Sequence, residues 1–259
     1  MQDNQPFYLH IESFSPHEYW DPPEDYYRLY MKSDYRGPWL IHPPENSRIL
    51  TPVEFEASRA MYAGLVTFVD KQIGTLMTHI ESLGLLDSTI ISFIADHGTM
   101  MGEQGQIHKG ETRIRTQVTH VPFALYHPGR HEGLRVSGYV QHTDLMPTVL
   151  DYLGVASPSR VTGLSRRSMI EAQAKSNFES VITGWGEHAA LRTPEWTYIT
   201  RWSPGPKFEQ LYDLKKDPKE LTNVADANPA VVAHFKEQLR EYVAGGWEIT
   251  RGTFANKLA

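Results

Sequence analysis

The stretch Thr89-Ile90-Ile91-Ser92-Phe93-Ile94-Ala95-Asp96-His97-Gly98 carries the strongest local signal in this sequence. Its first, largely apolar part predicts a buried strand over residues 89–94. The strand ends in a carboxylate, an imidazole and a glycine, at the position where open α/β sheets place their sites. Asp96 and His97 are therefore candidate metal ligands. Lys109, in the loop that follows, is a candidate for binding an anion.

A long amphipathic helix is predicted just before this strand. Thr51 can cap it, Pro52 suits its first turn, and Glu54 completes a capping box. Gly84 is the expected stop. Apolar residues recur between them at steps of three and four, which predicts one buried stripe: Tyr62, Leu65, Val69, Ile73, Leu76, Ile80 and Leu83. We expect this helix to cross over a sheet before the strand at residue 89.

Further elements alternate along the first two thirds of the chain. Strands are predicted at residues 7–12, 121–126 and 136–141, and a helix over residues 144–153 with Gly154 as its stop. Strands that alternate with helices indicate a layered α/β domain. We assign residues 1–174 to this domain.

The pattern changes after about residue 174. Short strands separated by turn residues predict a small antiparallel sheet: residues 181–183, 189–192, 196–201 and 210–213. A final helix is predicted to start at Asn228-Pro229 and to run to Gly245-Gly246. We assign residues 175–259 to a second, C-terminal subdomain made of this sheet and helix.

Composition excludes several classes of function. The 259 residues, 40% of them hydrophobic, can form one large domain or two smaller ones. A net charge of −6 argues against a general nucleic-acid surface. The absence of cysteine excludes a disulfide scaffold, thiolate-bound zinc and a cysteine nucleophile. No apolar run approaches the roughly 20 residues that span a membrane.

Several short segments occur in the order in which a known family has them. They are Pro6-Phe7-Tyr8, Pro16-His17-Glu18 and Asp21-Pro22-Pro23; Asp96-His97-Gly98, Gly102-Glu103-Gln104-Gly105, Lys109-Gly110 and Val121-Pro122; Asp144-Leu145-Met146-Pro147-Thr148-Val149-Leu150-Asp151; and Leu211-Tyr212-Asp213-Leu214, Asp217-Pro218-Lys219-Glu220 and Asn223. Together they resemble the sulfatases of the alkaline phosphatase superfamily, over nearly the whole chain.

The resemblance implies a hydrolase that cleaves sulfate esters of a small molecule or glycan with a divalent cation, usually Ca²⁺; Mg²⁺ and Mn²⁺ stay open. It implies a partial alkaline-phosphatase-like layered α/β domain. Asp96 and His97 match metal ligands of the family. Lys109 matches the lysine that contacts the sulfate group, and His17 matches the histidine near the leaving-group oxygen.

These residue types suit the reaction. A metal supplies Lewis acidity, a lysine offers a point charge to oxyanions, and a histidine that protonates the departing oxygen contributes about 10²–10⁴-fold. Structural roles stay open beside these. Asp96 can cap a turn, His97 and Lys109 can be solvated surface residues, and His17 can stack on Trp20. We interpret His108 and His142 as structural or peripheral.

The sequence departs from the family in two respects. Sulfatases also need two adjacent aspartates and a formylglycine nucleophile, made from Cys or Ser in a Cys/Ser-x-Pro-Ser-Arg motif. No Asp-Asp pair occurs here, and Ala156-Ser157-Pro158-Ser159-Arg160 has alanine at the nucleophile position, so we interpret it as a linker turn. Formylglycine is thus absent from this chain.

We therefore expect the chain to correspond to the C-terminal half or so of a sulfatase, inactive by itself. The missing N-terminal half or a second copy of the chain is a candidate partner. A phosphonate monoester or phosphodiester hydrolase of the same superfamily is the enzymatic alternative, because such relatives also use a histidine where His97 stands. A non-catalytic remnant that binds an anionic ligand is the other alternative.

Overall fold

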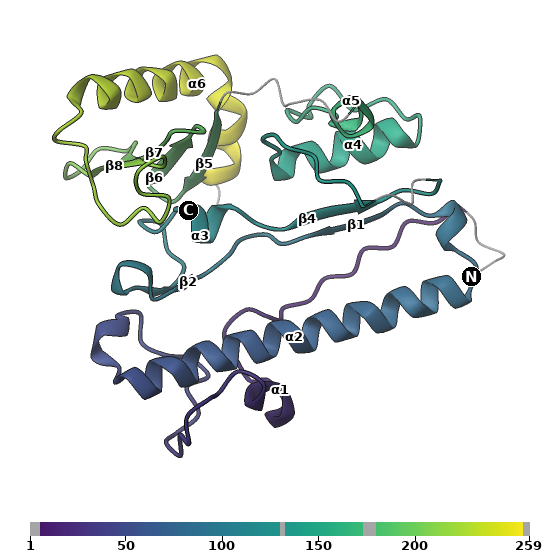
Figure 1. The fold of residues 1–259 in the computed structure, drawn as a ribbon. Coiled ribbons are helices and arrows are strands. Elements are labelled where there is room, and N and C mark those ends of the chain that lie inside the picture. Colours follow the sequence, from purple (N-terminus) through teal and green to yellow (C-terminus); the bar gives the residue numbers. More distant parts are fainter. Residues whose placement is uncertain (1–5, 130–132, 173–179, 256–259) are drawn as a thin grey trace. The chain divides into compact units, whose positions relative to one another are not determined.

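The computed structural model describes residues 6–129, 133–172 and 180–255, and the side chains of the last helix as far as Tyr242. The chain divides into two compact units (Figure 1). The first unit comprises Met1–Asp87 and Gly105–Ile107, and the second comprises Ser88–Gln104 and His108–Ala259. The domain boundary predicted between residues 174 and 175 falls within residues 173–179, outside the described residues, and stays a prediction.

The first unit is built around the long helix α2, Pro52–Ser82. The predicted capping box is confirmed: the Thr51 amide donates to Glu54 Oε2 at 2.8 Å, and the Glu54 amide donates to Thr51 Oγ1 at 3.4 Å. The short helix α1, Glu24–Arg28, was not predicted; it packs on α2. A Cβ on Gly64 would lie 2.9 Å from the Tyr27 amide nitrogen, so glycine permits this close approach. The 3₁₀ turns η1, Ser47–Ile49, and η2, Leu86–Ser88, flank α2.

The apolar stripe of α2 is buried only in part. Its buried residues lie in the N-terminal half of the helix: Ala57, Ser58, Ala60, Met61, Gly64 and Leu65. Leu76 and Leu83 are exposed. The prediction of one continuous buried stripe is therefore wrong for the second half. α1 contacts the middle of this helix, where the Lys71 ammonium lies 5.9 Å from the Tyr26 ring centroid.

Residues 7–12 do not form the predicted buried strand. Their backbone carries no strand assignment and their side chains are exposed, with Tyr8 at 85%. The prediction failed because a strand is stable only when another strand pairs with it. No described strand pairs with this segment.

In the second unit, β1 (Ile91–Ile94) pairs antiparallel with β4 (Phe123–Tyr126), so that Phe93 lies opposite Ala124. The predicted strands at both places are confirmed. The expected burial of β1 is wrong, because Phe93 is 43% exposed. In the described chain β4 is the one strand paired with β1, so β1 lies in a two-stranded ribbon. Between them come β2 (Met100–Met101), η3 (Glu103–Gly105), β3 (Ile107–His108) and α3 (Thr116–Thr119).

After β4 the chain forms η4 (His142–Asp144), α4 (Leu145–Tyr152) and α5 (Arg167–Ala172). The predicted helix and its stop are confirmed, since Gly154 follows α4 with φ 68°. The strand predicted at residues 136–141 is wrong; Gly138 takes φ 148°, a conformation outside the strand region. Residues 156–160 are an exposed segment that ends in a turn, as predicted.

The predicted antiparallel sheet is confirmed as a meander of β5 (Val181–Trp185), β6 (His188–Arg192), β7 (Trp196–Arg201) and β8 (Glu209–Asp213). Helix α6 (Pro229–Ala255) covers one face (Figure 1). Their shared core includes Leu191, Tyr198, Leu211, Phe235 and Leu239. The predicted stop at Gly245-Gly246 is wrong, because α6 continues through both glycines.

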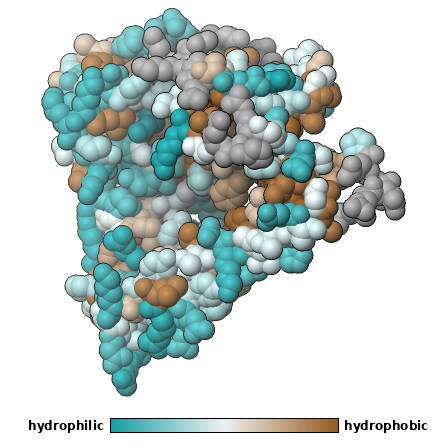
Figure 2. Space-filling view, turned by 45° about the vertical axis from the view of Figure 1, so that its right-hand side comes forward, coloured by the Kyte–Doolittle hydropathy of each residue, from teal (hydrophilic) through white to brown (hydrophobic). Residues whose placement is uncertain are grey.

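Hydrophobic side chains are also present on the surface. Figure 2 shows brown, hydrophobic residues between hydrophilic ones on the face that it displays. No helix in the described part of the chain combines the length and apolar character needed to cross a membrane.

Candidate functional site

The loop Asp96-His97-Gly98 is separated by one residue from the end of β1 and rests on the backbone of α3. The Gly98 amide donates to the Val118 carbonyl oxygen at 2.8 Å. A Cβ on Gly98 would lie 2.1 Å from the Gln117 carbonyl oxygen. No side chain fits in that space, so the glycine of this motif is required for the loop to lie against α3.

Asp96 and His97 face each other within this loop. His97 Nδ1 lies 3.0 Å from the Gly98 carbonyl oxygen. A carbonyl can only accept, so Nδ1 carries the proton, and in the neutral ring Nε2 carries the lone pair. His97 Nε2 lies 3.5 Å from Asp96 Oδ2, and the His97 amide donates to Asp96 Oδ1 at 2.8 Å. The Asp96 side chain is 86% exposed and that of His97 is 28% exposed.

A cavity of about 260 Å³ lies beside these two residues. Its walls come from separate parts of the second unit and include Asp96, His97, Thr119, His142, Thr183 and Trp185. The sequence prediction thus identified two of its polar groups. The cavity is large enough for a small ligand and is lined by side chains that can bind it through hydrogen bonds, charge and an aromatic face.

His142, interpreted from the sequence as structural or peripheral, also lines the cavity. Its Nε2 lies 2.8 Å from the Ala95 carbonyl oxygen, so Nε2 donates and His142 connects η4 to the end of β1. His142 thus combines a structural contact with a place in the cavity wall.

Thr183 and Trp185 are two further lining residues that the prediction missed. Both come from β5, and the Trp185 ring centroid lies 6.3 Å from that of His97. Thr183 and Trp185 are two positions apart on a strand, which places them on the same face. That spacing is the one sequence signal for the pair, and it does not reveal which surface the face meets.

Lys109 and His17, the other two predicted site residues, belong to different compact units. Lys109 follows β3, is half-buried, and accepts from Arg113 Nη1 at 3.2 Å through its carbonyl oxygen. It is not among the described residues that line the cavity. His17 belongs to the first unit, where its Nδ1 lies 2.9 Å from Glu18 Oε2 and its ring packs on Phe14. The roles predicted for both residues stay predictions.

The donor atoms near the cavity fit part of a metal site. The Asp96 carboxylate oxygen is a suitable ligand for Ca²⁺, Mg²⁺ or Mn²⁺, and the His97 imidazole favours a transition metal such as Mn²⁺ over the two harder cations. The Nδ1 contact of His97 is the kind of outer contact that orients a ligating imidazole. In the part of the chain that the structure describes, no three His, Asp or Glu side chains form a metal-binding group. Asp96 and His97 therefore need further ligands from another source.

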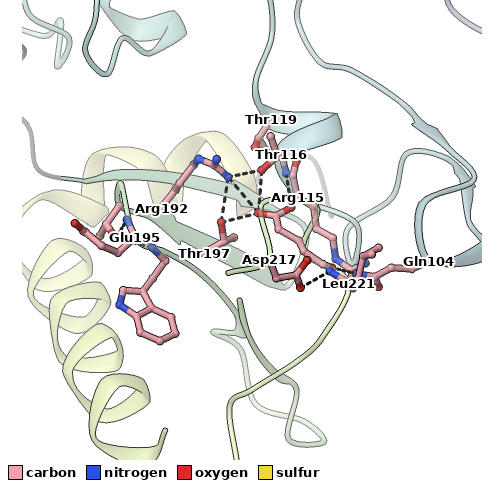
Figure 3. A network of polar contacts seen from close by, with 12 residues as sticks. Gln104, Arg115, Thr116, Thr119, Arg192, Glu195, Thr197, Asp217 and Leu221 are labelled. Atoms are coloured by element: carbon pink, nitrogen blue, oxygen red, sulfur yellow. Dashed lines mark hydrogen bonds and ion pairs between the residues drawn. The ribbon is translucent and has the colours of Figure 1, made fainter. Parts of the chain in front are cut away.

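A buried polar network holds α3, and hence the floor of the loop, against the C-terminal sheet (Figure 3). Its centre is the carboxylate of Glu220, whose side chain is fully buried. The Thr116 amide donates to Glu220 Oε2 at 3.0 Å, and the Thr197 hydroxyl donates to Oε1 at 2.6 Å. Arg192 Nη1 lies 3.1 Å from Oε1. The charge of Glu220 is thus paired and hydrogen-bonded, as a buried charge requires.

The segment around Glu220 is shaped by its own side chains. Asp217 Oδ2 accepts from the Leu221 and Thr222 amides at 2.6 and 2.7 Å. Asn223 Oδ1 accepts from the Leu211 amide at 2.9 Å. The C-terminal motif quoted for the family resemblance is therefore a structural element of this fold, which presents Glu220 to α3.

Arg115, just before α3, is also buried. Its guanidinium lies 5.2 Å from the Tyr212 ring centroid and donates to Gln210 Oε1 at 2.8 Å. Burial lowers the pKa of Arg115 and raises that of Tyr212, because both charged forms lose water. These contacts add a second attachment between α3 and β8.

Comparison with known proteins supports the family assignment. The family model described as Sulfatase matches residues 1–155, and the model described as N-sulphoglucosamine sulphohydrolase, C-terminal, matches residues 111–244. An arylsulfatase of Clostridium perfringens is 31% identical over 86% of this chain and 50% of its own length. Arylsulfatase K of Bos taurus is 28% identical over 86% of this chain and 42% of its own length. The chain thus spans about half the length of the curated relatives that it matches.

Solved structures show the same fold. The phosphonate monoester hydrolase SpPMH from Silicibacter pomeroyi matches with a TM-score of 0.66 and 28% identity, over 76% of this chain and 43% of that protein. BT4656, in complex with its substrate D-glucosamine-2-N,6-O-disulfate, matches with a TM-score of 0.63 and 25% identity, over 78% of this chain and 42% of that protein.

These matches confirm the predicted fold class: a partial alkaline-phosphatase-like α/β domain is followed by an antiparallel sheet with a terminal helix. With a family model that covers residues 1–155 and relatives that follow the chain over most of its length, this chain belongs to the sulfatase family.

Proposed function

We propose that this chain is part of a metal-dependent hydrolase that cleaves sulfate esters, and that Asp96 and His97 bind its divalent cation. The observation that carries the proposal is the 3.5 Å approach of His97 Nε2 to Asp96 Oδ2 at the wall of a cavity. The family assignment supports the reaction class. Ca²⁺ is our first candidate because sulfatases usually use it, with Mg²⁺ and Mn²⁺ as alternatives.

Each predicted residue has a distinct role in this proposal. A bound divalent cation supplies Lewis acidity to the sulfate oxygens. Lys109 contributes a positive charge to the same oxyanion. His17 gives its Nε2 proton to the departing ester oxygen, so that the alcohol leaves neutral. The contact of His17 Nδ1 with Glu18 Oε2 orients the ring for this transfer.

We also propose that the chain alone does not turn over. Water must displace the alcohol from sulfur, and the family carries this out through a formylglycine that this sequence does not contain. A polypeptide with the N-terminal half of a sulfatase, or a second copy of this chain, is the candidate partner. The substrate is a sulfated small molecule or glycan, a proposal supported by the sulfated glucosamine bound to BT4656.

Metal binding is tested by calorimetric titration of the chain with Ca²⁺, Mg²⁺ and Mn²⁺. We expect D96N and H97A each to weaken binding at least about tenfold, because each removes a donor atom. Asp70, exposed on α2, provides the matched control D70N, which keeps the parent affinity. Equal affinities for the parent, D96N and H97A would contradict the proposed metal site.

Inactivity is tested by incubating the purified chain with an aryl sulfate. We expect no hydrolysis above the buffer rate. Turnover in a sample that mass spectrometry shows to be free of other hydrolases would overturn this part of the proposal and leave the metal site standing.

A phosphonate monoester or phosphodiester hydrolase is the second candidate function. It is favoured by the structural match to SpPMH, whose TM-score of 0.66 compares with 0.63 for BT4656, and by the Asp-His pair. A binding competition between a sulfate monoester and a phosphonate monoester for the metal-loaded chain distinguishes the two candidate functions. Tighter binding of the phosphonate favours this alternative, and metal-independent binding of both favours a non-catalytic, anion-binding remnant.

A further inference from the structure

We propose that Thr183 and Trp185 of β5 form a carbohydrate subsite, in which Trp185 stacks on the sugar ring whose sulfate lies beside Asp96 and His97. The inference rests on the proposed function and deepens it, because it assigns the substrate class to sulfated sugars. It makes the C-terminal sheet part of the substrate site.

The placement of β5 is the first argument. β5 is an edge strand of the sheet, and Thr183 and Trp185 both line the cavity that Asp96 and His97 line. The Trp185 and His97 rings are 6.3 Å apart between centroids, with a 30° angle between their planes. A ligand with its anionic group at Asp96 and His97 therefore meets an aromatic ring within the length of one sugar.

The Trp185 ring is held in place before any ligand binds. It packs against a buried cluster of Ile114, Ala190, Ile199 and Tyr212. The following turn is fixed on both sides, because the Glu187 amide donates to Glu111 Oε2 at 3.1 Å and Trp202 Nε1 donates to the Gly186 carbonyl oxygen at 3.1 Å. A ring already fixed by packing loses little conformational entropy when a ligand stacks on it.

The chemistry of the wall favours a sugar over an aryl group. A pyranose combines an apolar face of C–H groups with a rim of hydroxyls. The wall offers the matching features: the Trp185 ring for the face, and the Thr183 and Thr119 hydroxyls with the His142 ring for the rim. Thr119 Oγ1 donates to the Arg115 carbonyl oxygen, so it can accept from a ligand. An aryl ring would leave these polar groups without partners, which costs binding free energy.

The size of the cavity points to one sugar ring. At about 260 Å³ it lies just below the range of roughly 300–1,000 Å³ that is typical of small-molecule pockets. We therefore assign it to the single sulfated residue of a substrate.

The test is ligand titration of the Ca²⁺-loaded chain by NMR, with D-glucosamine-2-N,6-O-disulfate, 4-nitrophenyl sulfate and inorganic sulfate as probes. W185A should weaken sugar binding about tenfold, an aromatic contact of about 1.4 kcal/mol. The same substitution should leave the affinity for inorganic sulfate within about twofold of the parent value, because sulfate alone does not reach the ring. W185F keeps an aromatic face and should restore most of the affinity. W39F is the matched control: it changes an exposed indole that is not among the described cavity residues, and it should bind like the parent.

The outcomes separate this inference from the proposed function. Metal-dependent sulfate binding that D96N abolishes, together with unchanged sugar affinity in W185A, overturns the subsite and keeps the function. If W185A loses more affinity for 4-nitrophenyl sulfate than for the sugar, the carbohydrate assignment is overturned. Failure of the parent to bind the sugar also overturns it. Sugar binding that depends on Trp185 but on neither Asp96 nor metal contradicts the proposed function instead.

Discussion

Thr116 donates both its backbone amide and its hydroxyl to the carboxylate of Glu220, at 3.0 and 2.9 Å, although the two residues are 104 positions apart. This pair connects the start of α3 to the segment after β8. Since α3 also supports Gly98, the pair links the C-terminal sheet to the loop of Asp96 and His97. The candidate site thus depends on residues far from its own motif.

Glu220 is expected to contribute strongly to stability. In E220A, the guanidinium of Arg192 and the amide and hydroxyl of Thr116 lose their buried acceptor, so the free energy of unfolding should fall by about 3–5 kcal/mol. E220Q keeps the shape of the side chain and should lower the free energy of unfolding by about 1–3 kcal/mol. Urea unfolding followed by tryptophan fluorescence measures both. The partly exposed Glu195 gives the control E195Q, and equal midpoints for E195Q and E220Q would refute the role given to Glu220.

Gly98 is expected not to tolerate a side chain. G98A places a methyl group against the Gln117 carbonyl oxygen, so it should reduce the free energy of unfolding by about 1–3 kcal/mol, as overpacking does. Gly74, within α2, has nothing within 4 Å of an added Cβ. G74A should therefore stabilise the protein by about 0.5–1 kcal/mol through helix propensity. Thermal unfolding of both variants measures these opposite changes in stability. A G98A variant as stable as the parent would show that the loop can move away from α3.

Asp144 and Arg166 form a buried ion pair, with Arg166 Nη2 2.7 Å from Asp144 Oδ2. Asp144 Oδ1 also accepts from the Leu164 amide at 2.9 Å. Removing one partner leaves the other charge buried, so D144A should lower the free energy of unfolding by about 3–5 kcal/mol. The more exposed pair of Arg167 and Glu171 supplies the control, E171A, with a much smaller loss. Similar denaturant midpoints for the two variants would contradict this expectation.

The protein should become less stable at acidic pH because the Glu209 carboxylate is protonated there. Burial acts to raise its pKa, but hydrogen bonds and charges from Lys236 and Lys207 outweigh burial and lower the pKa below 4.5. A carboxyl with a lowered folded-state pKa stabilises the fold fully above its unfolded pKa, and this stabilisation is lost as pH falls through the folded value. The melting temperature, measured from pH 6 to pH 3, should drop below about pH 4.5. E209Q should show a smaller drop; an identical acid limb in parent and E209Q would exclude Glu209 as a contributor.

Local sequence signals predicted much of the fold. The Thr51 and Glu54 capping box forms within one turn of helix, and the short strands from β5 to β8 pair with their neighbours along the chain. Residues 7–12 and 136–141 failed as strands because an apolar run becomes a strand only when a partner strand pairs with it. The burial of β1 was overestimated for the same reason: burial depends on which other elements cover the strand.

By itself, the sequence determined the family, the main helices, the C-terminal meander and the adjacent Asp96-His97 pair, because each of these depends on neighbouring residues or on motif order. Only the tertiary structure decided that His142, Thr183 and Trp185 share a cavity with that pair, and that Glu220 lies beneath α3. Contacts between distant segments follow from the packing of whole elements. A strand pattern tells which side chains share a face, but only packing places that face against the loop of a distant strand.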